Sequence, residues 1–229
     1  MINGSLGERL SVIDEAIADA ARRASREPKE ISRIVVTKFH PADTVRELYE
    51  LGVRDVGENR QQEFSAKATD CETLSDLRWH FIGQAQTNKA GAIRRAAHAV
   101  HSVDRTRIAD ALDRAAFDDS RLDIFIQINL TDDPGRGGVD PGGLEAFAEH
   151  VLALPTLTLR GLMAVAPLGE EPSAAFERLH GYAQRLRRVA PEASWISAGM
   201  TGDFAEAIAA GATHLRIGSA ITGPRPVQG

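Results

Sequence analysis

Two patterns alternate along most of the chain: short runs rich in Val, Ile, Leu and Phe, and longer segments in which apolar residues recur with helical spacing. The short runs predict strands at 31–38, 54–58, 78–83, 99–104, 123–129, 159–165, 194–200 and 213–218. The longer segments predict helices at 43–51, 59–69, 87–97, 105–117, 141–153, 171–189 and 203–210, preceded by an N-terminal helix at about 5–26. Strands that alternate with helices pair in parallel through right-handed crossovers.

Eight strand–helix units in a chain of 229 residues favour a (β/α)8 barrel over an open sheet. We therefore predict an α/β fold in which residues 1–229 form a single TIM barrel domain with an additional N-terminal helix. No low-complexity segment or linker rich in Pro, Gly or Ser interrupts the pattern. In such a barrel the active groups gather at the carboxyl ends of the strands, so those positions are the candidates for a site.

Several expected helices begin or end beside residues that favour a helix terminus. Asp104 and Asp203 each stand just before an expected helix, where an aspartate side chain can cap the first backbone N–H groups. Gly52 and Gly211 each follow a helical segment, at the position where a left-handed residue commonly ends a helix. We expect two aspartate caps and a positive φ at both glycines.

The charge and the cysteine content exclude several classes of protein. The formal net charge of −5 provides no general attraction for nucleic acid or anionic membranes. The single cysteine, Cys71, cannot form an internal disulfide, and no Cys/His grouping has the spacing of a zinc site. No run approaches the ~18 apolar residues of a membrane span, and the start MINGSLGERL lacks the apolar segment of a signal peptide. We expect a cytoplasmic protein that binds no nucleic acid, membrane or metal.

Lys38 ends the first expected strand, within the segment RIVVTKFHP at 33–41. A lysine forms an imine with an aldehyde only through its neutral amine, so its ordinary pKa of about 10.4 must fall. Apolar surroundings on the inside of a barrel lower the pKa because they disfavour the ammonium. The alternative is a structural lysine whose charged end reaches solvent.

The segments after the last two strands are both suited to binding phosphate. SAGMTGDF, at 197–204, offers hydroxyls and backbone N–H groups ahead of a helix, where an anion is favoured. RIGSAITG, at 216–223, places Gly218 and Ser219 directly after strand eight, and Arg216 on that strand faces either a ligand or a structural ion pair. Gly and Ser are also common turn formers, but TIM barrels often bind phosphate between these two loops. A phosphate site across the mouth from a lysine describes a ligand with an anion and a carbonyl.

Other polar residues are weaker candidates. Asn59 and Met163 also stand at the ends of expected strands. His80 lies between Trp79 and Phe81 on an apolar strand, and we interpret it as a core histidine whose hydrogen bonds are satisfied. The remaining histidines are dispersed without metal-ligand pairing: His40, His98, His101, His150, His180 and His214.

The order of the motifs resembles one known family. The segments are VTKFHP, VGENRQQE, WHFIGQAQTNK, HSVDR, FIQINL, LRGLMAVAP and SAGMTGDFAEAIAAGATHLRIGSAITG. In this order, over about residues 31–225, they are similar to the pyridoxal phosphate homeostasis protein family. The resemblance implies a single barrel related to the N-terminal domain of alanine racemase, with pyridoxal 5′-phosphate (PLP) as its cofactor.

The resemblance also implies roles for individual residues. Lys38 would hold PLP as a Schiff base, and Arg216 would face the pyridine nitrogen and keep it unprotonated, which weakens the ring as an electron sink. The cofactor-binding residues that the resemblance implies are Lys38, Asn59, Ser197, Gly199, Met200, Thr201, Arg216, Gly218 and Ser219, and we add Met163 because it stands at the end of an expected strand. Ser197 to Thr201 and Gly218-Ser219 would form the two phosphate loops. Three positions depart from the family pattern, so the resemblance does not define the residues at the edge of the pocket: Arg60, Gln84-Ala85-Gln86 and Thr222.

Three functions are compatible with these residues. The resemblance favours a PLP-binding protein without a dedicated catalytic cycle, which buffers or delivers the cofactor in vitamin B6 and amino- or keto-acid homeostasis, with PLP-dependent apoenzymes as partners and a monomer as the default state. An amino-acid racemase needs an acid/base group on each face of the substrate, but the two tyrosines, Tyr49 and Tyr182, both fall in predicted helices. A Schiff-base aldolase acting on a sugar phosphate would use the same lysine and loops without a cofactor.

Overall fold

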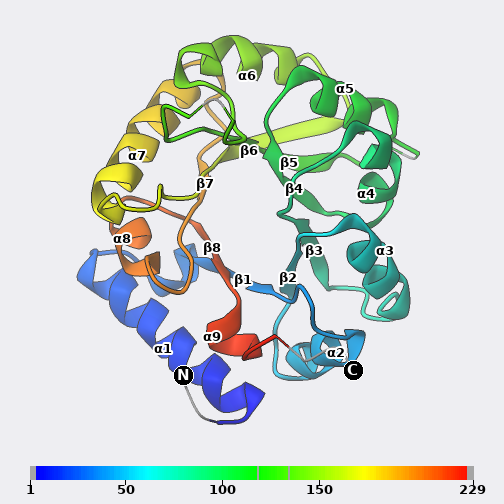
Figure 1. The fold of residues 1–229 in the computed structure, drawn as a ribbon, viewed down its shortest axis with the longest axis vertical. Helices are drawn as coiled ribbons and strands as arrows, with labels where there is room; N and C mark the ends of the chain where they lie inside the picture. Colours follow the sequence, from blue (N-terminus) through cyan, green and yellow to red (C-terminus); the bar gives the residue numbers. More distant parts are fainter. Residues whose placement is uncertain (1–3, 118, 134, 226–229) are drawn as a thin grey trace.

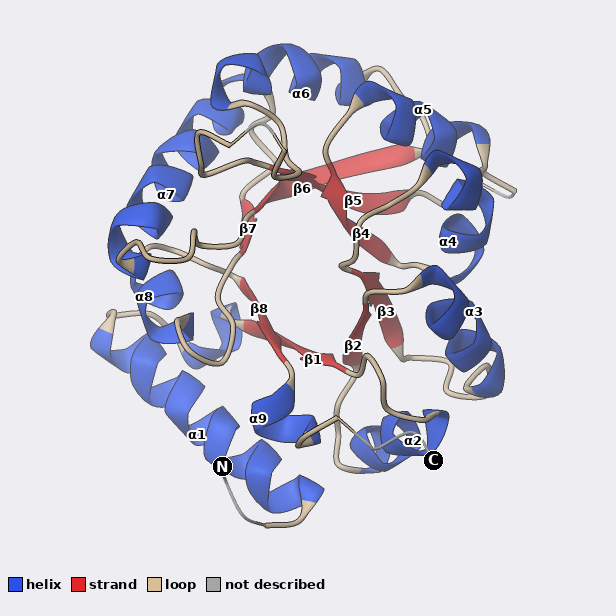
Figure 2. Cartoon of the chain, in the orientation of Figure 1, coloured by secondary structure: helices blue, strands red, loops and turns tan. Residues whose placement is uncertain are grey.

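Eight parallel strands close into a barrel in which each strand pairs with its neighbours in chain order, so the predicted TIM barrel is confirmed (Figures 1 and 2). This computed structural model describes residues 4–117, 119–133 and 135–225. The strands are β1 Ser32–Val36, β2 Asp55–Glu58, β3 Arg78–Phe81, β4 Ala99–Val103, β5 Leu122–Gln127, β6 Leu157–Met163, β7 Trp195–Ser197 and β8 His214–Ile217. Parallel pairing of β8 with β1, from Ser32 with His214 to Val35 with Ile217, closes the ring.

Helices surround the barrel (Figure 2). They are α1 Leu6–Arg23, α2 Ala42–Glu50, α3 Gln61–Asp70, α4 Ala90–Ala96, α5 Thr106–Arg114, α6 Leu144–Leu152, α7 Pro172–Val189, α8 Phe204–Ala209 and α9 Ser219–Thr222. Short 3-10 turns lie at η1 Pro28–Glu30, η2 Thr87–Lys89 and η3 Pro141–Gly143. The predicted N-terminal helix is α1, which packs against α8 and α9 beside β8 and β1 (Figure 1).

Local sequence explains where α1 begins. The Ser5 hydroxyl accepts a hydrogen bond from the Glu8 backbone N–H at 3.3 Å, and the Glu8 carboxylate accepts one from the Ser5 N–H at 2.7 Å. This reciprocal cap satisfies two N–H groups that a helix start otherwise leaves free. The buried side chains of α1 recur at helical spacing and form its contact with the barrel: Leu6, Leu10, Ile13, Ile17, Ala20 and Ala21.

The main hydrophobic core lies between the outer face of the barrel and the helices. Strand residues such as Val35 and Ile124 are fully buried in it together with apolar helix side chains. Side chains of neighbouring strand residues point to opposite faces, so Phe125 points to the centre of the barrel, where it packs with Met163 and Ala99 in a separate small cluster. Apolar side chains therefore fill only part of the centre, and polar residues occupy the rest.

The two predicted aspartate caps are wrong. Asp104 pairs with the guanidinium of Arg105, and no side chain caps the start of α5. Asp203 accepts a hydrogen bond from the backbone N–H of Met200 at 2.6 Å, so its carboxylate closes the preceding turn and does not cap α8. In both places a nearer donor outside the helix takes the carboxylate. The predicted left-handed glycines are confirmed, with φ of 88° at Gly52 and 98° at Gly211.

Several elements are shorter than predicted. The strand expected at 194–200 is limited to Trp195–Ser197, and the strand expected at 31–38 ends at Val36. Residues 37–38 and 198–200 instead belong to the loops at the carboxyl end of the barrel, which is where the candidate site lies. In the part of the chain that the structure describes, no helix is both long and apolar enough to cross a bilayer.

Candidate functional site

Lys38 lies just after β1, at the carboxyl end of the barrel. The preceding residue, Thr37, points outward, because its hydroxyl donates to Glu58 and its carbonyl accepts from Lys67 of α3. Alternation then directs Lys38 to the inner side of the ring. Lys38 is half-buried, and among the described residues no carboxylate lies within ion-pair distance of its amine.

Phe39 gives the chain a sharp turn directly after Lys38. Its φ of 70° lies in the left-handed region, which costs an L-residue roughly 1–2 kcal/mol. The Phe39 backbone N–H donates to Glu63 at 3.1 Å, and its ring packs beneath the guanidinium groups of Arg60 at 4.9 Å and Arg225 at 4.2 Å. These contacts hold the strained residue in place. They also fix the backbone that carries the Lys38 side chain.

A buried ion pair supports the same corner of the barrel from outside. Lys67 donates to the Glu58 carboxylate at 2.6 Å and to the Thr37 carbonyl at 2.8 Å, and the Glu58 side chain is completely buried. Burial raises the pKa of Glu58 although the hydrogen bonds from Lys67 and Thr37 lower it. The second carboxylate oxygen of Glu58 accepts no hydrogen bond from the described residues. The pair therefore ties α3 to the ends of β1 and β2.

The loop after β7 leaves backbone donors free at the mouth. Gly199 has a φ of 91°, and a Cβ there would lie 2.8 Å from the Ala207 side chain and 3.0 Å from the Phe204 backbone. Only glycine fits this close approach between the loop and α8. In the described part of the chain, the N–H groups of Thr201 and Gly202 donate to no protein acceptor, and both residues are exposed.

The loop after β8 lies beside it and has the same property. The carbonyl of Gly218 accepts from the N–H groups of Ile221 and Thr222 at 2.8 and 3.0 Å, which folds the short helix α9. Within residues 135–225, the N–H groups of Gly218 and Ser219 have no backbone acceptor. Among the described residues, two neighbouring loops thus present N–H groups of Thr201, Gly202, Gly218 and Ser219 for which no loop or side-chain acceptor is seen, an arrangement suited to a phosphate.

Arg216 lies on β8 beneath these loops and is almost fully buried. One of its terminal nitrogens donates to the Ser197 hydroxyl at 2.7 Å, and the other donates to the Ala164 carbonyl at 2.8 Å. Burial lowers the pKa of Arg216 to about 10, against an opposing effect of Asp203, so the guanidinium is charged at neutral pH. Among the described residues it has no carboxylate partner. The hydroxyl of Ser197, which is completely buried, is already engaged inside the barrel.

The remaining predicted residues lie at different depths. Asn59 follows β2 and touches Gly83, where an added Cβ would lie 1.8 Å from the Asn59 carbonyl oxygen, so the loop after β3 requires glycine there. Met163 ends β6 and is buried with Phe125 at the centre of the barrel, below the loops. Met200 is 40% exposed in the loop after β7. The mouth thus gathers the predicted residues around Lys38 and the two loops, with Met163 deeper.

The barrel centre holds a histidine cluster that the sequence patterns did not predict. The interpretation of His80 as a satisfied core residue agrees with the structure, since His80 is buried and bonds to Asp55 and His101. His101 stacks on Phe125 with ring centroids 4.2 Å apart, and the His214 ring lies near both. In the described residues no group of side chains has the arrangement of a metal site. Alternation along each strand directs these side chains inward. The cluster also depends on contacts between strands far apart in the sequence, such as β4 with His101 and β8 with His214, and the pattern within one strand does not reveal these contacts.

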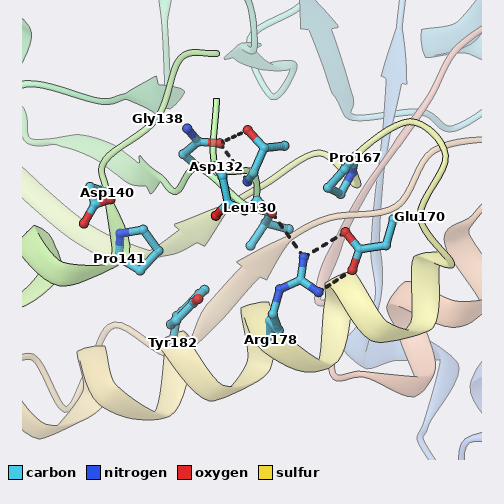
Figure 3. Close-up of a pocket in the computed structure, with 11 residues that line it drawn as sticks. Leu130, Asp132, Gly138, Asp140, Pro141, Pro167, Glu170, Arg178 and Tyr182 are labelled. Atoms are coloured by element: carbon cyan, nitrogen blue, oxygen red, sulfur yellow. Dashed lines mark hydrogen bonds and ion pairs between the residues drawn. The ribbon is translucent and has the colours of Figure 1, made fainter. Parts of the chain in front are cut away.

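A large cavity lies outside this site. It measures about 910 Å³ and is lined by the loops after β5 and β6 and by α7 (Figure 3). Arg178 crosses one side and donates to the Glu170 carboxylate and to the Leu130 carbonyl at 3.1 Å. None of the predicted cofactor-binding residues lines it. The mouth is the candidate site, because Lys38, Arg216 and, among the described residues, loop N–H groups without an acceptor lie there.

Replacing Gly199 with alanine is expected to destabilise the protein by at least about 1–2 kcal/mol, the cost of a left-handed L-residue. The added methyl group would also press on α8, 2.8 Å from the Ala207 side chain. Urea unfolding measures the change. Gly202→Ala is the matched control, since nothing lies within 4 Å of a Cβ at Gly202. Equal midpoints for the two variants would contradict the proposed constraint at Gly199.

Comparisons with known proteins agree with the fold and with the motifs. The chain matches the family model of the alanine racemase N-terminal domain over residues 12–226. It is 39% identical, over 242 aligned positions, to the pyridoxal phosphate homeostasis protein of Mycobacterium tuberculosis. That alignment covers 97% of this chain and 94% of the relative.

Two solved structures of PipY from Synechococcus elongatus are similar to this chain over almost its whole length. The structure without PLP has a TM-score of 0.85 and 35% identity, and it covers 96% of this chain and 100% of PipY. The structure with PLP bound has a TM-score of 0.83 and 34% identity, with the same coverage.

Proposed function

The chain belongs to the pyridoxal phosphate homeostasis protein family, and we propose that it binds PLP at the mouth of the barrel and buffers or delivers this cofactor. The observation that carries the proposal is the convergence at one mouth of three features of the described residues: the half-buried Lys38 amine, backbone N–H groups without a protein acceptor in the two loops, and a buried guanidinium. PLP combines an aldehyde, a phosphate and an aromatic nitrogen that accepts a hydrogen bond. Each of the three groups at the mouth matches one part of this molecule.

The phosphate would lie against the loops after β7 and β8. Thr201, Gly202, Gly218 and Ser219 supply the N–H donors, and the hydroxyls of Thr201 and Ser219 are exposed beside them. Hydrogen bonds to a charged acceptor are worth about 1.5–3 kcal/mol each. These loops would therefore provide most of the affinity, with Gly199 and Met200 shaping the first of them.

Lys38 would hold the aldehyde carbon as a Schiff base. Its half-buried position on the inner side of the mouth supports this role, because the amine faces the space that the aldehyde would occupy. Arg216 would donate to the aromatic nitrogen and Asn59 would lie beside the ring. When bound, PLP supplies an electron sink, and a guanidinium at its nitrogen keeps that nitrogen unprotonated and the sink weak.

The positions of the two tyrosines support a role without a dedicated reaction. Racemisation needs a second acid/base group opposite Lys38. Tyr49 donates its hydroxyl to Asp76 on the outer helix layer, and Tyr182 lies on α7 at the separate cavity (Figure 3). Neither tyrosine is placed to serve as that group. We therefore expect no appreciable turnover of D- or L-alanine.

Borohydride reduction of the protein incubated with PLP tests the proposal. We expect a yellow protein whose reduced, digested form carries the cofactor on the peptide that contains Lys38, as read by mass spectrometry. A colourless protein with no modified peptide would contradict PLP binding through a Schiff base. A colourless protein that instead traps a sugar phosphate on Lys38 would favour an aldolase.

The double variant Thr201→Ala with Ser219→Ala is expected to raise the PLP dissociation constant at least about tenfold, because it removes two hydroxyl donors to the phosphate. Absorbance titration with PLP measures the change. Ser11→Ala with Ser173→Ala removes two exposed hydroxyls from α1 and α7 and serves as the control. Equal affinities in the two double variants would place the phosphate elsewhere.

The cellular role would be exchange of PLP with PLP-dependent apoenzymes. An exposed phosphate loop and an accessible amine support reversible loading. We propose that the protein acts as a monomer in the cytoplasm, and sedimentation of the loaded and unloaded protein tests its oligomeric state.

A further inference from the structure

An unbroken row of hydrogen bonds crosses the centre of the barrel and ends at Arg216. Asp55 at the start of β2 bonds to Nε2 of His80 at 2.8 Å, and His80 Nδ1 bonds to Nε2 of His101 at 2.9 Å. His101 Nδ1 bonds to the Ser197 hydroxyl at 2.8 Å, which accepts from Arg216 at 2.7 Å. The row thus connects the amino end of the strands with the mouth.

The row passes through the interior and not along the sheet. His101 belongs to β4 and Ser197 to β7, which are not neighbours in the ring, so their hydrogen bond spans the barrel centre. The pairing of β4 with β5 shifts register between Val100 and Val103, with one extra residue on β4. Such a bulge redirects a side chain, and here it lies where His101 enters the row. His101 is completely buried.

The residues at the two ends of the row determine in which direction its hydrogen bonds are donated. A guanidinium can only donate hydrogen bonds, so the Ser197 hydroxyl accepts from Arg216 and has its own proton for His101. At the other end the Asp55 carboxylate can only accept: burial raises its pKa, but hydrogen bonds from His80 and Arg78 outweigh this and bring it to about 2. Asp55 is therefore ionised at neutral pH.

Only one arrangement of protons satisfies every member with neutral histidines. Ser197 donates to His101 Nδ1, His101 Nε2 donates to His80 Nδ1, and His80 Nε2 donates to Asp55. Burial lowers the pKa of His101 far below its usual range, and the charge of Arg216 adds to the effect, so His101 is neutral. Both histidines then carry their proton on Nε2.

We propose that Asp55, His80, His101 and Ser197 form a positioning relay that holds the Arg216 guanidinium in place for an aromatic nitrogen acceptor at the mouth. The inference rests on the proposed function, because the acceptor is the pyridine nitrogen of PLP. Ser197 is the link that touches Arg216, while Asp55, His80 and His101 act through it.

The energetic reason lies in the surroundings of Arg216. It is a buried cation whose hydrogen-bond acceptors are a hydroxyl and a carbonyl, with no carboxylate among the described residues. A hydroxyl that donates its own proton onward is a stronger acceptor, because consecutive hydrogen bonds polarise one another. The relay thus links Arg216 to a carboxylate at the opposite end of the barrel.

The proton positions can be measured without cofactor. Two-bond nitrogen–proton correlation spectra of the full chain with labelled histidines are expected to report a neutral His101 with its proton on Nε2, and a proton on His80 Nε2 that is shared with Asp55. Spectra of His80→Gln and His101→Gln assign the two residues. A His101 proton on Nδ1 would overturn the relay, because the Ser197 hydroxyl could then not donate to it.

Asp55→Asn tests transmission along the row. An asparagine can offer either its carbonyl or its amide to His80, so the direction is no longer fixed, and we expect His101, which does not contact Asp55, to show mixed proton positions. We expect the PLP dissociation constant to rise about three- to tenfold, the effect of one weakened hydrogen bond. The Ser197→Ala variant should weaken PLP by at least as much.

Two controls separate the relay from general destabilisation. Asp123→Asn removes a carboxylate that lies at the same end of the barrel but pairs with Arg160. Arg78→Gln removes the other partner of Asp55 and leaves its bond to His80. Both should keep the His101 signal and change the PLP dissociation constant less than about twofold. An Asp55→Asn protein that matches these controls in both readouts would overturn the proposal.

Failure of the proposed function gives a different result. If the unmutated protein takes up no PLP, the proposed function is wrong and the role toward the aromatic nitrogen falls with it, whatever the histidine signals are. If the unmutated protein binds PLP but Asp55→Asn and Ser197→Ala bind it equally well, only the relay is wrong.

Discussion

In a Lys38→Ala variant, borohydride is expected to fix no PLP to the chain, whereas the unmutated protein should carry it on Lys38. The variant lacks the amine that would form the Schiff base with the aldehyde at the mouth. Mass spectrometry of the reduced and digested protein measures the loss. Binding should persist without the covalent bond, because the loops at Thr201 and Ser219 are intact.

Two further variants sharpen this test. Lys38→Arg keeps a positive charge but stays protonated, so it should also lose all borohydride-fixed PLP. Lys89→Ala removes a lysine from the rim of the barrel, beside Asn59, and should leave the modification unchanged. Retained covalent PLP in both Lys38 variants would move the Schiff base to another lysine and overturn the assignment.

A Lys67→Met variant is expected to lose about 3–5 kcal/mol of unfolding free energy, because it leaves the Glu58 carboxylate buried without its cation. Urea unfolding at neutral pH measures the loss. The double variant Glu58→Gln with Lys67→Met removes both charges and should recover most of it. A double variant as unstable as Lys67→Met would mean that packing, and not the unpaired charge, determines the cost.

The same variant should depend on pH in a defined direction. Burial already raises the pKa of Glu58 in the folded protein, and removal of Lys67 raises it further. A folded-state pKa above the unfolded value means that the folded protein binds the proton more tightly, so stability falls as the pH rises between the two values. Lys67→Met should therefore regain stability when the pH is lowered from 7 towards 5, and the double variant should not.

The architecture followed from local patterns in the sequence. The strand around Val35 and the helix before Gly52 are both recognised from residues close in the chain. Apolar spacing identifies the two elements, and a glycine suited to a left-handed turn marks the end of the helix. The exposed ends of the elements followed from the same patterns, which is why Lys38 and Ser219 could be assigned to the mouth before the fold was known. The two aspartate caps failed because a nearby competing donor, Arg105 or the Met200 N–H, is invisible to spacing rules.

The barrel centre could not be predicted in this way. His101 and Ser197 are separated by 96 positions and meet only because the ring is closed. The bulge that redirects His101 depends on the register between β4 and β5, which single residues do not encode. The left-handed Phe39 was equally hidden, since its strain is balanced by Arg60 and Arg225 from the rest of the chain.

The closed ring of strands also limits how another protein can attach. Each described strand of the barrel is paired on both sides, so the sheet has no free edge to which a partner could add a strand of its own. An apoenzyme that receives the cofactor by direct handover would therefore have to contact the loops around Lys38. Such an apoenzyme would cover the opening of the barrel through which the cofactor leaves, so docking of the partner and release of the cofactor would be coupled.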